Sequence, residues 1–129
     1  MTEIRTYFED TDAGGVVYYA KYLRYLEQGR TDFLRDRGLS LRELQDRGFL
    51  IPVIHLEIDY LSPAVLYDHL RVETSVLKVT GGTFTLGQKV IRVSDGTLLA
   101  DARVTLACMG TERKARRLPK ELLSVLNAS

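Results

Sequence analysis

The chain has 129 residues, of which 45% are hydrophobic and 27% charged, a composition typical of one globular domain with one core. Its 18 basic and 17 acidic residues leave a formal net charge of +1, so no strong overall field draws the protein to nucleic acid or to a membrane surface. A chain this short buries only about two-thirds of the surface that its unfolded form exposes, so a site enclosing a long ligand is expected to need a second subunit.

A short strand and a long helix are the first elements expected. Residues 4–8 alternate between apolar and polar side chains and predict a strand, which ends in the polar, turn-prone segment 9–15. From Val17 onward apolar side chains recur at spacings of three and four, which predicts one amphipathic helix ending at Gly38. Gly29 in its interior costs about 1 kcal/mol relative to alanine, so we expect the helix backbone to pack closely against a flat surface such as a sheet.

A second, short helix is indicated by Ser40 as N-cap with Glu43 three residues on, and it is expected to stop near Gly48. The residues beyond it have the alternation of strands. The expected strands, separated by turns at Gly81-Gly82 and Asp95-Gly96, are 54–60, 70–76, 83–93 and 98–108. Pro119 then predicts the start of a last helix.

Strands joined by tight turns form antiparallel hairpins, and one long early helix must cover a face of the resulting sheet. The sequence therefore predicts an α+β fold in which a long central helix is wrapped by a five-stranded antiparallel sheet. The other face of the sheet also needs cover, which a second copy of the chain would supply. We expect residues 1–129 to form a single domain that assembles as a homodimer or homotetramer.

The segment that carries the chemistry is YFEDTDAGGVVYYAKY, residues 7–22, which contains the pattern D-x-D-x-x-G-V-V-Y. It resembles the 4-hydroxybenzoyl-CoA thioesterase branch of the hotdog superfamily, and most closely the YbgC-like acyl-CoA thioesterases associated with the Tol-Pal cluster. The resemblance continues in order through Leu26-Glu27, Arg30-Thr31, Asp59-Tyr60, Ser62-Pro63-Ala64, Asp68 and Arg117-Leu118-Pro119, so it covers nearly the whole chain. It implies the hotdog fold and hydrolysis of a fatty or aromatic acyl-CoA thioester to the free acid and CoA.

The resemblance implies that Asp12 is the catalytic carboxylate, because the second aspartate of the family motif falls there. In the family this carboxylate acts as nucleophile or as general base for a water, two roles that the sequence does not separate. The helix start expected at residues 17–19 would present N–H groups and a positive dipole to an oxyanion, with the Tyr19 N–H as the donor by family analogy. Substrate contacts beside it are expected from Gly15, Val16 and Tyr18.

Other interpretations of this region were weighed. Asp10, Thr11 and Asp12 are also typical of turns and helix caps, and for Asp10 we expect that structural role. A calcium loop is excluded because its twelfth position is Lys21, where a bidentate glutamate is required. Glu27 on the long helix stays open, since another hotdog branch takes its working carboxylate from that helix and the spacing also fits a surface charge.

Two positions depart from the family. Many YbgC-like members carry histidine where this chain has Tyr19, so a general-base histidine is missing from the loop and Asp12 is its sole candidate. The usual Pro-Ala-Arg segment reads Pro63-Ala64-Val65 here, which removes a basic group and bears on the inherited substrate preference.

The phosphates of CoA need basic partners. The run containing Arg113, Lys114 and Arg116 is the candidate, although such a run is also typical of a solvated face. Thr83, just after the Gly81-Gly82 turn, is expected either to meet substrate across the dimer or to be a plain strand residue.

No metal or other cofactor is expected. His55 and His69 have no Cys or His neighbour at ligand spacing, and Cys108 alternates with core residues and lacks a nearby base. That single cysteine cannot form an internal disulfide, residues 1–12 lack the pattern of a secretion signal, and no apolar stretch approaches the roughly 20 residues that span a bilayer. A cytoplasmic protein with no integral membrane segment is predicted. The rival functions are an acyl-CoA hydratase and a non-catalytic acyl-CoA-binding module.

Overall fold

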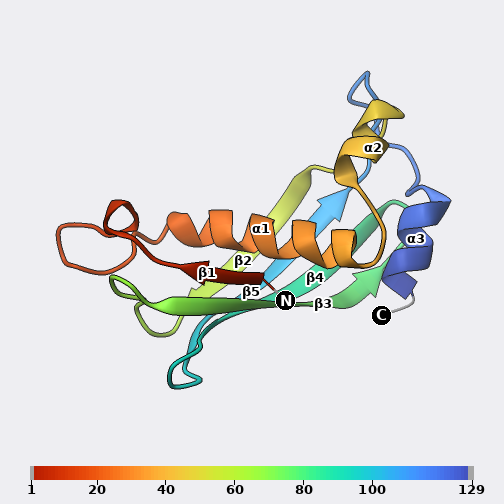
Figure 1. The fold of residues 1–129 in the computed structure, drawn as a ribbon. Helices are drawn as coiled ribbons and strands as arrows, with labels where there is room; N and C mark the ends of the chain where they lie inside the picture. Colours follow the sequence, from red (N-terminus) through yellow and green to blue (C-terminus); the bar gives the residue numbers. More distant parts are fainter. Residues whose placement is uncertain (1, 128–129) are drawn as a thin grey trace.

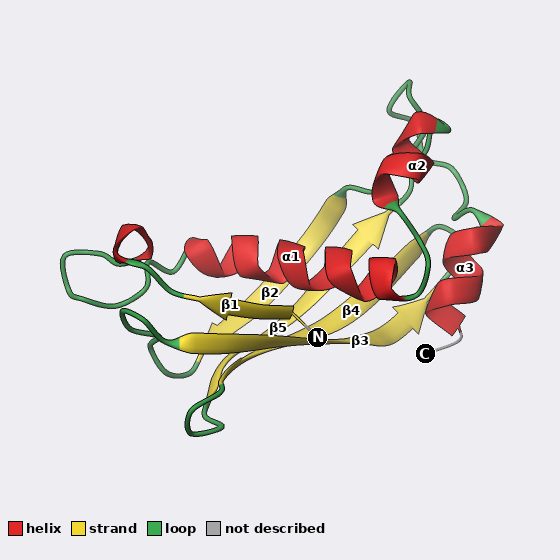
Figure 2. Ribbon diagram, in the orientation of Figure 1, coloured by secondary structure: helices red, strands yellow, loops and turns green. Residues whose placement is uncertain are grey.

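A computed structural model describes residues 2–127, which form one five-stranded antiparallel sheet crossed by a long helix (Figure 1). The strands are β1 (Thr2–Arg5), β2 (Val53–Tyr60), β3 (His69–Val79), β4 (Thr83–Arg92) and β5 (Leu98–Ala107). The helices are the 3₁₀ turn η1 (Phe8–Asp10), the long α1 (Lys21–Asp36), α2 (Leu41–Asp46) and α3 (Lys120–Asn127). Figure 2 shows α1 lying across the sheet, with α2 and α3 near one end of it. The predicted α+β architecture is confirmed.

The strand order is β1-β3-β4-β5-β2, with every neighbouring pair antiparallel. The two tight turns predicted from the sequence join β3 to β4 and β4 to β5. Strand β2 does not pair with β3, the next strand along the chain, but lies beside β5, where Leu56 is opposite Val104. Within residues 2–127, β2 is therefore an edge strand with one unpaired side.

The core lies between α1 and the sheet and divides into two groups of buried residues. One group surrounds the first half of α1 and includes Tyr22, Tyr25, Leu26, Leu70, Val72, Val90 and Ala100. The other surrounds its second half and includes Phe33, Leu34, Phe84, Leu86, Val104, Leu106 and Leu122. Alternate residues of β3, β4 and β5 supply the sheet side, as the period of a half-buried strand requires.

Gly29 brings α1 against the sheet, as predicted. A Cβ at this position would lie only 2.5 Å from Val72 Cγ1, so no larger residue fits without movement of helix or strand. Beside it, the fully buried Gln88 donates from Nε2 to the Leu26 carbonyl at 2.9 Å and to Thr74 Oγ1 at 3.1 Å. This contact fixes how α1 lies on β3 and β4.

The predicted start of the long helix is wrong, since α1 begins at Lys21 and not at Val17. Val16 and Val17 instead form isolated antiparallel bridges with Val65 and Thr11, and the Val17 N–H donates to the Ala64 carbonyl at 2.8 Å. Because these backbone groups are used in pairing with other segments, helical hydrogen bonds cannot include them.

The first strand is also shorter than predicted, ending at Arg5 where residues up to Phe8 were expected. The Thr6 hydroxyl donates to the Val65 carbonyl, and Thr6 Oγ1 accepts from the Asp68 N–H at 2.9 Å. The Tyr7 N–H is taken by the Asp10 carboxylate, which folds Phe8–Asp10 into a turn. Contacts with the β2–β3 connection therefore replace strand pairing at this point.

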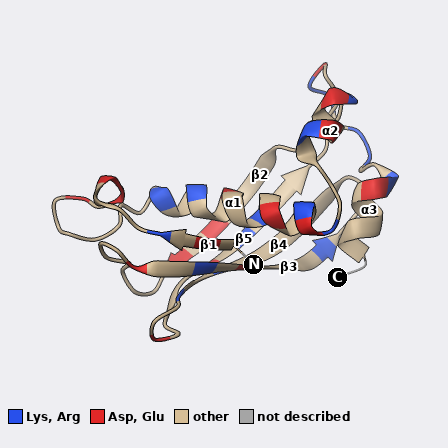
Figure 3. Cartoon of the chain, viewed as in Figure 1, with Lys and Arg blue, Asp and Glu red and all other residues tan. Residues whose placement is uncertain are grey.

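The two shorter helices agree with the capping signals. Ser40 Oγ accepts from the Glu43 N–H at 3.3 Å, and Gly48 follows α2 with a φ of 87° that favours glycine. Helix α3 begins directly after Pro119. Acidic and basic residues are interspersed over the fold (Figure 3), and among the described helices there is none whose length and apolarity would let it span a bilayer.

Candidate active site

The β1–α1 loop, residues 6–20, projects beyond the first turn of α1 at one end of the molecule (Figure 1). Short backbone hydrogen bonds hold it: the Asp12 N–H donates to the Val16 carbonyl at 2.8 Å, and the Gly15 N–H donates back to the Asp12 carbonyl at 3.0 Å. Gly15 has a φ of 81°, a conformation that closes this reversal and that other residues rarely adopt. The loop is therefore an ordered turn that places Asp12 at its start.

The Asp12 carboxylate is exposed and has one oriented oxygen. Its Oδ1 accepts from the Gly14 N–H at 2.8 Å, while no hydrogen bond or ion pair within the described chain engages Oδ2. The side chain borders an open surface depression of about 580 Å³, also lined by Phe8, Thr11, Gly15 and Leu66. A carboxylate with one oxygen fixed and the other unengaged can attack a carbonyl or take a proton from water.

Asp10 has the structural role expected of it. Its Oδ2 accepts from the Tyr7 N–H at 2.9 Å, its Oδ1 lies 3.8 Å from Lys21 Nζ, and its carbonyl accepts from the Tyr18 N–H at 2.8 Å. Asp10 thus joins both sides of the loop to the start of α1. Of the two aspartates, it is Asp10 that is committed to the loop and Asp12 that is left for a ligand.

The oxyanion donors cannot be the first N–H groups of α1. Those of Lys21, Tyr22 and Leu23 already donate to the carbonyls of residues 18–20 at 2.9, 3.3 and 3.2 Å. Among the hydrogen bonds that involve residues 2–127, none uses the N–H of Tyr19, which leaves that donor for a ligand. Tyr19 does not lie at the start of a helix, as was predicted, but its N–H group is still available as a donor.

The Tyr19 backbone is held from the sheet side. Its carbonyl accepts from the Tyr60 hydroxyl at 3.0 Å, and the two rings meet edge to face with centroids 6.2 Å apart. Tyr18 packs on the Tyr19 ring at 4.7 Å. The Tyr18 carbonyl shares a peptide plane with the Tyr19 N–H and accepts from the Lys21 N–H at 2.9 Å, so the donor is placed before any ligand arrives.

A tyrosine-lined cavity of about 280 Å³ adjoins this segment. Its walls include Val17, Tyr19, Tyr22, Tyr60 and Pro63. The Tyr22 hydroxyl accepts from the Ala64 N–H at 3.1 Å. Burial raises the pKa of Tyr22, with Arg92 opposing, and burial also raises the pKa of Tyr60. Both hydroxyls therefore stay protonated near neutral pH and can donate. Sequence reasoning did not assign Tyr22 and Tyr60 to the site, although both lie in segments that carry the family resemblance.

Val65, one of the two departures from the family, lies in a firmly held connection. Its N–H donates to Asp68 Oδ2 at 2.9 Å, and the same oxygen accepts from Arg92 Nε at 3.0 Å. Arg92 also donates to the Pro63 carbonyl at 2.7 Å. The exposed Val65 side chain therefore presents an apolar surface, from a fixed backbone, at the position where the family resemblance implies a basic group.

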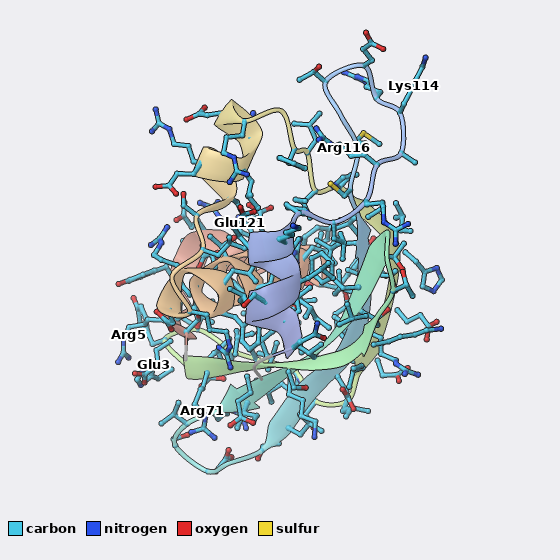
Figure 4. The ribbon with its side chains drawn as sticks, turned by 90° about the vertical axis from the view of Figure 1, so that its right-hand side faces the viewer. Glu3, Arg5, Arg71, Lys114, Arg116 and Glu121 are labelled. Atoms are coloured by element: carbon cyan, nitrogen blue, oxygen red, sulfur yellow. The ribbon has the colours of Figure 1, made fainter. Side chains whose placement is uncertain are left out.

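The remaining predicted substrate contacts lie at the other end of the molecule. Thr83 begins β4 beside α3, and its Oγ1 lies 2.8 Å from Thr80 Oγ1. Figure 4 shows Lys114 extended from the loop between β5 and α3, whereas Arg116 turns back toward the body. The Arg116 guanidinium lies 3.8 Å above the Phe49 ring and donates to the Gly48 carbonyl at 3.3 Å. One chain therefore does not bring Thr83, Arg113, Lys114 and Arg116 to Asp12.

The other titratable candidates have ordinary local partners. His55 pairs with Glu57 at 2.8 Å, and His69 pairs with Glu3 at 2.9 Å. Burial raises the pKa of the Cys108 thiol, which disfavours the nucleophilic thiolate. Across residues 2–127 no group of three or more Cys, His, Asp or Glu side chains is placed to hold a metal ion. Glu27 lines a different cavity from the depression beside Asp12.

Comparisons with known proteins agree on one family. A family model described as the thioesterase-like superfamily matches residues 7–126. The chain is 40% identical over 121 residues to an acyl-CoA thioesterase YbgC of Haemophilus influenzae, covering 92% of this chain and 88% of that protein. It is 34% identical over 122 residues to the acyl-CoA thioester hydrolase YbgC of an Escherichia coli O6:H1 strain, covering 94% and 90%.

A solved structure shares the fold over nearly the full length. The crystal structure of a 1,4-dihydroxy-2-naphthoyl-CoA thioesterase from Synechocystis superposes with a TM-score of 0.91 at 27% identity, covering 98% of this chain and 93% of that one. The family match, the relatives and the sheet wrapped around α1 together show that this chain belongs to the thioesterase-like superfamily, as a hotdog protein of its YbgC-like acyl-CoA thioesterase branch.

Proposed function

We propose that this protein hydrolyses acyl-CoA thioesters to the free acid and CoA in the cytoplasm, with Asp12 as the catalytic carboxylate and the Tyr19 N–H as an oxyanion donor. The observation that carries the proposal is the pairing, in one ordered loop, of an exposed carboxylate with one unengaged oxygen and a backbone N–H with no acceptor in the described chain. The names of the relatives support the reaction class. They include an acyl-CoA thioesterase whose name specifies no acyl group and a 1,4-dihydroxy-2-naphthoyl-CoA hydrolase, so fatty and aromatic acyl groups are both substrate candidates.

The reaction can proceed by either of two routes, which differ in the role of Asp12. As general base, Asp12 takes a proton from water while the water oxygen bonds to the thioester carbon, and the C–S bond then breaks as the sulfur takes up a proton. As nucleophile, Asp12 bonds to that carbon, CoA leaves as the thiol, and water cleaves the resulting anhydride. In both routes the carbonyl oxygen becomes negative in the transition state, where a fixed N–H stabilises it. Losing one such donor typically costs about 2.7–4 kcal/mol.

We infer that the working unit is a homo-oligomer, because a single chain holds two separated halves of the site. The depression beside Asp12 is open, and the basic residues suited to the CoA phosphates lie at the far end. The unpaired side of β2, its exposed apolar residues Val53 and Ile54, and the exposed Leu61 directly after the strand suit pairing with a second copy. A two-fold dimer built there would bring the end of one subunit toward the opposite end of its partner. The charged hollow on the outer face of the sheet, lined by Glu57, Lys89 and Arg103, suits assembly of two such dimers.

The proposal is tested by measuring free-thiol release from a series of acyl-CoA thioesters. Asp12→Asn keeps the shape of the side chain but removes its charge. We expect it to bind CoA as the parent does and to lower kcat by about 10²- to 10⁴-fold, the range for loss of a general base. Glu9→Gln, an equivalent change at an exposed neighbour in the same loop, is the matched control and should retain full activity.

If Asp12→Asn releases thiol at the parental rate, Asp12 is not the catalytic carboxylate. Hydration of an enoyl-CoA without thiol release would instead identify a hydratase. Binding of acyl-CoA with no turnover of any member of the series would identify a binding module.

A further inference from the structure

A further cavity, also of about 280 Å³, lies between α1 and the sheet, apart from the depression beside Asp12 and from the tyrosine-lined cavity. Most of its lining residues are apolar, and they include Leu34 in the second half of α1 and Phe84 and Leu86 in the facing strand β4. Its polar residues all come from one stretch of α1: Glu27, Arg30 and Thr31. The start of β2, at Val53, also lines it, so the cavity adjoins the unpaired edge strand.

Arg30 is the unusual member of this wall. Its Nη1 is buried, yet it has no hydrogen-bond partner within the described chain. The guanidinium forms no ion pair with any described residue, including Glu27 one helical turn earlier. Burial lowers the pKa of Arg30 while the charge of Glu27 opposes the shift, and an arginine remains protonated under such conditions. A charged side chain therefore borders the cavity with one buried N–H group unpaired, which costs stability in the absence of a partner.

Apolar walls with one placed polar group are the usual composition of a small-molecule site, where the walls supply affinity and the polar group selects. The volume lies near the lower limit of about 300 Å³ for such sites, so it suits the end of an acyl group and not the nucleotide of CoA. Arg30 lies nine residues beyond the first residue of α1. At about 1.5 Å per residue, roughly 13 Å of helix separates the two positions. The cavity is thus placed for the far end of an acyl group and not for the thioester.

We propose that this cavity receives the distal end of the acyl group, and that Arg30 determines specificity by favouring acyl groups that carry an oxygen acceptor there. A terminal carboxylate or hydroxyl would accept a hydrogen bond from the Arg30 guanidinium, whereas a methyl end could not. The proposal rests on the acyl-CoA thioesterase activity proposed above. It adds Arg30, a residue outside the β1–α1 loop, to the residues that select the substrate.

The test compares pairs of acyl-CoA thioesters with equal carbon counts, one ending in a methyl group and the other in a carboxylate or hydroxyl, over a series of chain lengths. At the length that reaches the cavity, we expect the parent to favour the oxygen-bearing member by about tenfold or more in kcat/KM, the discrimination of a charge-assisted hydrogen bond. Arg30→Met removes the donor but keeps most of the volume, so kcat/KM for the oxygen-bearing member should fall to the value for the methyl-ended member. Arg24→Met, on the exposed side of the same helix, is the matched control and should keep the preference.

Several results would overturn the proposal. The parent could show no preference at any length, Arg30→Met could keep the preference, or that variant could slow every substrate equally with a lower melting temperature, which would make Arg30 only structural. If Arg30→Met does not fold, Arg30→Lys retains the charge without the planar fork. That variant should lose part of the preference, and an unchanged ratio would count against the proposal.

Failure of the proposed function gives a different result. If the parent hydrolyses no thioester in the series, calorimetric titration with the free monocarboxylic and dicarboxylic acids tests the cavity by itself. Tighter binding of the dicarboxylic acid by the parent than by Arg30→Met would support the cavity's selectivity, and equal binding by the two proteins would refute it.

Discussion

The two ends of the molecule carry the two halves of the candidate site, and they are built differently. At one end, the β1–α1 loop is fixed by backbone hydrogen bonds and by the Asp10 side chain, and the Asp12 Oδ2 and the Tyr19 N–H are among the groups left to a ligand. At the other end, backbone hydrogen bonds also hold the loop between β5 and α3 (residues 108–119), but the Lys114 side chain is highly exposed and pairs only loosely with Glu112 at 4.0 Å. Chemistry at a carbonyl needs atoms placed to within a fraction of an ångström, whereas attraction of phosphates needs mainly charge. The difference in how the side chains are held therefore matches a difference in task.

The division of the site between the two ends of the molecule is tested most strongly by mixing two variants, one impaired at each end. Charge reversal at the basic end, Arg113→Glu with Lys114→Glu, should lower kcat/KM by about 10- to 100-fold at low salt because it repels the phosphates. In a mixed dimer with Asp12→Asn, one site would combine an intact loop with an intact basic end. After subunit exchange we expect about a quarter of the parental activity, since half of randomly paired dimers are mixed and each restores one of its two sites.

The control for this experiment carries Asp12→Asn on both partners, so that no intact loop is present and mixing restores nothing. Demonstrated exchange of subunits without recovery of activity would mean that each chain works alone, and the division of the site between subunits would be wrong.

Weakening the hydrogen bonds that hold the β1–α1 loop should have the next largest effect on activity. Asp10→Ala removes the acceptor for the Tyr7 N–H and the partner of Lys21, while leaving Asp12 in place. We expect a loss of about 1 kcal/mol in the free energy of unfolding, the usual value of such a cap, and a fall in kcat of up to about tenfold as the Tyr18–Tyr19 segment becomes less fixed. Denaturant titration and thiol release measure the two effects. If turnover is unchanged despite the lost stability, the order of the loop does not matter for catalysis.

The smallest effect is expected at the exposed charge of Lys114, at the other end of the molecule. Lys114→Gln should raise KM by about threefold at low salt and leave kcat and stability unchanged, because an exposed charge contributes little and is screened. The increase should disappear at high salt. A change in kcat, or an effect that salt does not alter, would mean that Lys114 makes a specific contact and is not merely part of a diffuse field.

Features that depend on neighbouring residues were predictable from the sequence. The Ser40 cap, the β3–β4 and β4–β5 turns, and the close approach at Gly29 each have a local signal, and each was confirmed. The family motif likewise identified Asp12 and Tyr19 as one group, and both lie in the same loop. Their catalytic roles remain predictions.

Features that depend on distant segments were not predictable in the same way. The apolar period continues through Val17, but the bridge partners that keep Val16 and Val17 out of the helix are residues 11 and 65. The pairing of β2 with β5 joins segments far apart in the chain. The separation of the basic residues from Asp12, and the unpartnered Arg30, follow from that same long-range topology. No local pattern encodes them.

The burial of Cys108 has a practical consequence for the thiol-release measurements described above. It is the chain's sole cysteine and is only 1% exposed in the folded protein. A thiol-reactive dye added to the intact protein will therefore be consumed by newly liberated CoA and not by the protein itself. When a variant begins to unfold, the same dye gains a second, slower target. One colour change, followed over two timescales, then reports both turnover and structural integrity in a single cuvette.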